Sequence, residues 1–73
     1  MRKISVLIAG QHSTSISLES EFLTELKKIA DERDLSLNQL ITEVDSMRTG
    51  ENLSSALRVY ILQYYKNKLL TPE

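Results

Sequence analysis

A short strand pattern with no obvious strand beside it constrains this chain more than any other feature. Residues 13–19 read Ser-Thr-Ser-Ile-Ser-Leu-Glu, so threonine and apolar side chains alternate with serines and a glutamate. A period of two is typical of a half-buried β-strand. An isolated strand leaves its edge N–H and C=O groups and its apolar face without partners. We therefore expect it to pair antiparallel with the same strand of a second copy, across a two-fold axis.

The residues before this strand are less clear. Ile4, Val6 and Ile8 also alternate, but Leu7 makes the segment apolar on both sides, and Gly10 follows soon after. Residues 1–11 are therefore interpreted either as an N-terminal arm or as an extra strand.

The small size of the chain also favours a homodimer. A domain of 73 residues is marginally stable alone, and such chains usually need a disulfide, a metal or a partner chain. The sequence has no cysteine, and a single histidine, His12, cannot build a structural zinc site. A second copy is the remaining means of stabilisation, and no cofactor or metal is expected.

Helical periodicity replaces the strand pattern after residue 19. Residues 20–33 carry one apolar stripe, and a second helix follows between the 34–36 turn and a stop at residues 49–51. Ser36 and Gln39 have the spacing of a capping box at the start of that second helix. A third helix is expected over about 53–69, with Asn52 as its cap.

The expected fold is mainly α with one short strand: a homodimer with an intersubunit antiparallel β-ribbon and an extra C-terminal helix. Residues 12–49 form the core and residues 50–73 the C-terminal helix, which packs on the dimer. The second helix is expected to bury Leu37, Leu40, Ile41, Val44 and Met47. The residues assigned to the dimer core are Ile16, Leu18, Phe22, Leu26, Leu40, Ile41 and Val44.

Charge and motifs exclude several classes of function. The net charge of −1 counts against a nucleic-acid partner, although both ends of the chain are mildly basic. No apolar run is long enough to span a membrane, and a cytoplasmic protein is expected. Ser54 and Ser55 are expected to cap the third helix, because no catalytic constellation surrounds them. An enzyme is not expected.

Three segments resemble a known family. Residues 14–19 read Thr-Ser-Ile-Ser-Leu-Glu, and residues 35–38 read Leu-Ser-Leu-Asn where the second helix opens. Residues 52–59 then read Asn-Leu-Ser-Ser-Ala-Leu-Arg-Val. In this order they resemble the Arc/MetJ-type ribbon-helix-helix domain, most closely the small bacterial ribbon-helix-helix proteins with a third C-terminal helix. The resemblance covers about residues 12–66.

The resemblance implies a transcriptional regulator whose paired strands enter the major groove of double-stranded DNA. Two dimers side by side on one site would fit this mode. The residues it assigns to base contact are Ser13, Ser15 and Ser17. The free N–H groups at the start of the second helix favour a backbone phosphate. The residues expected at phosphates are Ser36, Leu37 and Asn38, with Arg2 and Lys3 in the arm.

Some residues depart from the family pattern and favour an alternative. Ser13 replaces an arginine of the family's strand, so the outward row holds only hydroxyls and Glu19. Asp34 stands where glycine is common, and an acid there repels a phosphate. Gln11 is an extra residue before the strand. The alternative is a protein-interaction or antitoxin-like module with weak or no DNA binding, which uses the third helix and residues 4–8 as its contact surface.

Overall fold

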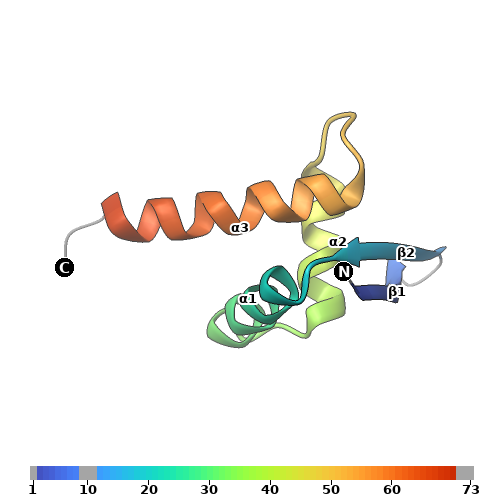
Figure 1. Cartoon of the computed structure of the whole chain (residues 1–73), viewed down its shortest axis with the longest axis horizontal. Helices are drawn as coiled ribbons and strands as arrows, with labels where there is room; N and C mark the ends of the chain where they lie inside the picture. The colour runs from blue at the N-terminus through green and yellow to red at the C-terminus, as the bar shows by residue number, and fades with distance from the viewer. Residues whose placement is uncertain (1, 9–11, 71–73) are drawn as a thin grey trace.

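The chain folds into a two-stranded sheet followed by three helices, as the computed structural model shows for residues 2–8 and 12–70 (Figure 1). The expected mainly helical fold with its order of three helices is confirmed. In Figure 1, α3 runs past the other helices toward the C-terminus. The elements are β1 (Arg2–Ile8), β2 (His12–Leu18), α1 (Ser20–Glu32), α2 (Leu37–Met47) and α3 (Leu53–Leu70).

β1 settles the alternative left open for the N-terminal residues. It pairs antiparallel with β2, and Ile4 lies opposite Ile16. The premise that the serine-rich strand has no partner in its own subunit is therefore wrong. Leu7 concealed this strand from the pattern, because it is apolar yet 44% exposed on the outer side of the sheet. The extra residue Gln11 lies outside the described part of the chain, and pairing between two copies stays a prediction.

One face of the sheet closes the core and the other faces outwards. Val6, Ile16 and Leu18 are buried, whereas their neighbours along each strand are mostly exposed. This alternation follows from the pleat, which sends successive side chains to opposite faces. The residues of the outward face are Lys3, Ser5, Leu7, Ser13, Ser15 and Ser17.

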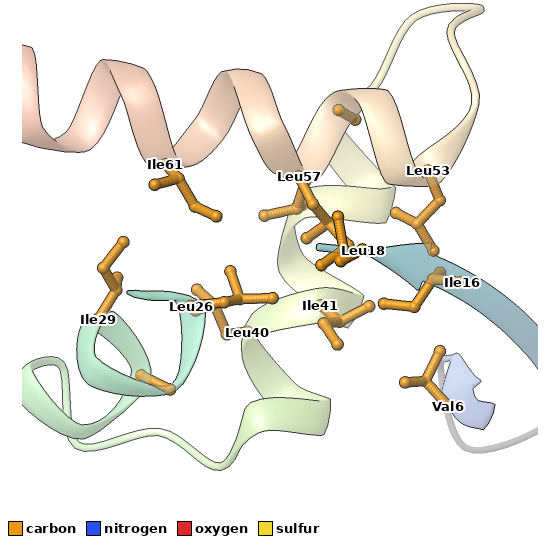
Figure 2. Close-up of a cluster of buried hydrophobic side chains, with 13 residues drawn as sticks. Val6, Ile16, Leu18, Leu26, Ile29, Leu40, Ile41, Leu53, Leu57 and Ile61 are labelled. Atoms are coloured by element: carbon orange, nitrogen blue, oxygen red, sulfur yellow. The ribbon is translucent and has the colours of Figure 1, made fainter. Parts of the chain in front are cut away.

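The core draws side chains from every element of this single subunit (Figure 2). Most side chains assigned to the dimer core lie in it, and Leu26, Leu40 and Ile41 have no exposed surface. Phe22 is only partly buried at its margin. Burial of each large side chain stabilises the fold by about 1.5–3 kcal/mol. The core is thus closed within one subunit, and whether a second copy shares it stays a prediction.

α2 begins with the expected capping box, but its last residue is more exposed than expected. Ser36 accepts a hydrogen bond from the Gln39 backbone N–H, and the Gln39 side chain accepts one from the Ser36 backbone N–H. Asp34, in the turn before it, has a φ of 60°, which is why glycine would suit this position. Met47 was expected in the core but is 57% exposed, because it is the last residue of α2 and lines an open hollow between α2 and α3.

Tyrosine hydroxyls hold α3 against the other helices. Tyr65 donates to Glu25 at 2.8 Å, and Tyr64 donates to Glu32 at 2.6 Å. Lys68 also binds Glu32, and the two bonds lower the pKa of that carboxyl. The hydrogen bond to Glu25 raises the pKa of Tyr65 to about 12.

The Tyr65 hydroxyl predicts a loss of stability at high pH. Its pKa is higher in the folded than in the unfolded protein, so its contribution is complete below pH 10 and disappears as the pH rises to about 12. Tyr65→Phe removes about 1 kcal/mol of unfolding free energy at neutral pH. We expect the difference in Tm between the wild type and this variant, measured by circular dichroism, to shrink across that window. A constant difference would contradict the assignment.

Candidate nucleic-acid interface

The outward face of the sheet brings the three predicted base-facing serines into one row. The register pairs Ser13 with Leu7, Ser15 with Ser5, and Ser17 with Lys3. β1 therefore adds a hydroxyl, an apolar side chain and a cation beside the row. Serine hydroxyls donate and accept hydrogen bonds, so the face is suited to polar contacts with base edges, although serine discriminates poorly among bases.

The outer edge of β1 is closed at one end by a side chain of α2. The Leu7 backbone N–H donates to Asn38 Oδ1 at 3.0 Å, and Asn38 Nδ2 donates to the Leu7 carbonyl at 2.7 Å. The amide of Asn38 thus satisfies a donor and an acceptor as a neighbouring strand would. The backbone N–H of Asn38 was expected at a DNA phosphate, which stays a prediction, while the side chain has this separate role at the edge of β1.

The outer edge of β2 is closed at its end by α3. The Ser17 backbone N–H donates to Ser54 Oγ at 3.2 Å, and Arg58 Nη2 lies 3.5 Å from the Ser17 carbonyl. The expectation that Ser54 caps α3 is therefore wrong. Asn52 caps the helix by accepting from the Ser55 N–H at 2.8 Å.

Arg58 also neutralises the acid that ends the serine row. Its guanidinium lies 3.0 Å from Glu19 Oε1 and 5.9 Å from the centre of the Phe22 ring. Two hydrogen bonds lower the pKa of the Glu19 carboxyl. The larger effect comes from the backbone N–H of Glu19 itself, and the second from the Arg58 side chain. The carboxylate is therefore charged at neutral pH but paired, which reduces its repulsion of a nucleic acid.

These contacts show which parts of the two edges stay open. In an antiparallel pair, residues whose backbone groups face the partner strand alternate with residues whose groups face outwards. Because Leu7 and Ser17 face outwards, counting by two along each strand identifies the others. Lys3 and Ser5 lie on the edge of β1, and Ser13 and Ser15 lie on the edge of β2. Within residues 2–8 and 12–70, no side chain closes these four positions.

The start of α2 offers less to a phosphate than its residues suggest. The Ser36 backbone N–H donates to Gln39 Oε1 at 2.8 Å in the capping box, so it is not free for a phosphate. The backbone N–H groups of Leu37 and Asn38 are in the first turn, where helices leave donors unpaired. An anion there would meet these two N–H groups and no cation of α2. Of the two cations assigned to the arm, Lys3 is exposed, and the Arg2 side chain lies outside the described residues.

The described part of the chain offers neither a membrane span nor a metal cluster. None of its helices is long and apolar enough to cross a bilayer. Among the same residues, no group of three or more histidine, cysteine or acidic side chains is placed to hold a metal ion.

Comparisons with known proteins give one result. A family model described as a ribbon-helix-helix domain matches residues 1–65. No curated protein and no solved structure gives a significant match. The matched residues include both strands, α1, α2 and most of α3.

The closure of β1 predicts a local effect for Asn38→Ala. Loss of the two hydrogen bonds to Leu7 should accelerate hydrogen exchange at the Leu7 amide and cost about 1–2 kcal/mol. Gln39→Ala is the matched control, because it removes a hydrogen bond from the same helical turn without touching β1. Equal exchange at the Leu7 amide in both variants would refute the closure.

Proposed function

Because the chain belongs to the ribbon-helix-helix domain family, we propose that it is a homodimeric DNA-binding protein that regulates transcription in the bacterial cytoplasm. The observation that carries this proposal is the outward face of the sheet, where Ser13, Ser15 and Ser17 form a row beside an open strand edge. Ribbon-helix-helix dimers such as Arc and MetJ read DNA with paired strands.

The open edge of β2 suggests how two copies pair. Ser13 and Ser15 have free outward backbone groups, whereas Ser17 is held by α3. An antiparallel pair of β2 strands that uses only the open positions sets Ser13 of one copy opposite Ser15 of the other. The two-fold axis then passes between the Thr14 residues of the two copies. Any register that includes Ser17 would first have to break its bond to Ser54.

The width of the resulting sheet assigns different roles to its strands. With β1 outside β2 in each copy, four strands lie side by side, and the outer two are about 14 Å apart. The major groove is about 12 Å wide. The two β2 strands then enter the groove, and Lys3 on β1 falls near its phosphate rim. The free N–H groups of Leu37 and Asn38 would add an uncharged phosphate contact.

Proline substitutions test the dimer. Ser15→Pro removes an N–H on the open edge of β2 and leaves the β1–β2 ladder intact, since that N–H points away from β1. We expect light scattering to give twice 8.3 kDa for the wild type and 8.3 kDa for Ser15→Pro. Ser5→Pro, the same change on the edge of β1, should stay dimeric. A folded monomeric wild type would refute the dimer.

Salt dependence tests DNA binding. We expect fluorescence anisotropy with mixed genomic fragments to show an affinity that falls steeply as salt rises, because phosphate contacts release counterions. Lys3→Gln should reduce the slope of log affinity against log salt by about one per subunit. Lys66→Gln on α3, far from the sheet, is the control and should leave the slope unchanged. Absence of binding at low salt would refute the proposal.

A further inference from the structure

A second open strand edge lies on β1, away from the proposed two-fold axis. Lys3 and Ser5 direct their free backbone groups outwards, and Asn38 closes the edge at Leu7. Because β1 is the outer strand of the proposed dimer, this edge stays open when two copies pair through β2. An open ladder is a template for another extended chain.

An apolar groove lies beneath this edge. It has a volume of about 310 Å³, and β1, α1 and α2 contribute its walls. Asn38 both lines the groove and binds Leu7, so groove and edge are contiguous. Leu23, which is 4% exposed, lines it without belonging to the main core cluster. The apolar lining is Ile4, Val6, Leu23 and Leu37.

The charge around the groove is positive. Lys27 is the charged residue of its lining, and Lys3 lies on the adjoining strand. Neither ammonium group has a hydrogen bond or ion pair within the described ranges 2–8 and 12–70. The acids of α1 that bind tyrosines, Glu25 and Glu32, are engaged by α3 instead. The outward face of the β1 edge, where Lys3 lies, therefore suits an acidic side chain.

We propose that the outer edge of β1 binds an extended segment of a partner protein in which apolar and acidic residues alternate. The segment adds a strand beside Lys3 and Ser5, because their free N–H and C=O groups supply its backbone partners. Its apolar side chains enter the groove, and the acidic side chains that alternate with them point to the outward face and meet Lys3. Asn38 sets the register, because an added strand cannot pair with Leu7 while the Asn38 amide occupies it.

The same features disfavour a second copy of this chain at the β1 edge. Antiparallel pairing of β1 with itself through the open positions sets Lys3 of each copy opposite Ser5 of the other. A second copy thus offers Lys3 a hydroxyl and no acid, whereas an acidic segment offers the opposite charge that stabilises a cross-strand pair. The proposal does not depend on DNA binding, since it uses the edge opposite the one that pairs the dimer.

A labelled peptide tests the proposal. The probe is a short fluorescein-tagged peptide of alternating valine and glutamate, and its binding to the full chain is followed by anisotropy. We expect saturable binding that Ser5→Pro weakens at least tenfold, because proline removes an N–H from the outer edge. Ser15→Pro is the matched control and should bind the peptide as the wild type does, even where it abolishes the dimer.

A second variant and two control peptides test the proposal without relying on the Ser5→Pro variant being folded. Lys3→Glu, at an exposed position of the outward face, should weaken binding of the glutamate peptide and strengthen binding of an alternating valine–lysine peptide. A fully N-methylated glutamate peptide should not bind, since it cannot form the ladder. Absence of binding by the glutamate peptide, equal binding of the N-methylated form, or equal loss in both proline variants would overturn the proposal. A loss of dimer mass in Ser5→Pro would also overturn it and assign this edge to self-association.

Discussion

Satisfaction of the sheet's backbone edges is the constraint on which the rest of this structure depends. A two-stranded hairpin is at best marginally stable alone in water, because its outer edges and one face lack partners. Here α2 supplies Asn38 to the edge of β1, and α3 supplies Ser54 to the edge of β2. These side chains attach the sheet to helices that are distant in sequence. They also limit any further pairing to Ser13 and Ser15 on one edge and to Lys3 and Ser5 on the other.

The local rules of the sequence recovered the helices and failed on the sheet for identifiable reasons. Ser36 and Gln39 marked the start of α2, and Asn52 that of α3, because a cap is an interaction within one turn. The edge closures join residues 31 and 37 positions apart, which no periodic pattern encodes. They also redefine the candidate site. The serine row was visible as an alternation, whereas the roles of Asn38 and Ser54 required the register between the strands.

Closure of the core within one subunit changes what a dimer would rest on. Size alone suggested that a second copy completes the core, yet Leu26, Leu40 and Ile41 are fully buried without one. Pairing through the open positions of β2 adds backbone hydrogen bonds, each of which contributes about 0.5–1.5 kcal/mol net. Such an interface is weak unless apolar surface accompanies it. Exposed apolar side chains do exist on the helices, for example Met47 and Val59, which are 57% and 54% exposed. DNA that binds both subunits would favour the same pairing, because a ligand of the dimer stabilises it by mass action.

The two open edges would not act independently in such a complex. Lys3 belongs to both proposed surfaces: its ammonium group would lie at the phosphate rim in the proposed DNA-bound dimer and beside the acidic segment at the edge of β1. An acidic strand there neutralises Lys3 and places negative charge about one strand spacing, some 4.8 Å, outside β1. Phosphate and partner then compete for the same cation, and their charges repel. By reciprocity, each ligand weakens the other by the same factor. A regulator built in this way would release DNA when its protein partner binds, without any change in the fold.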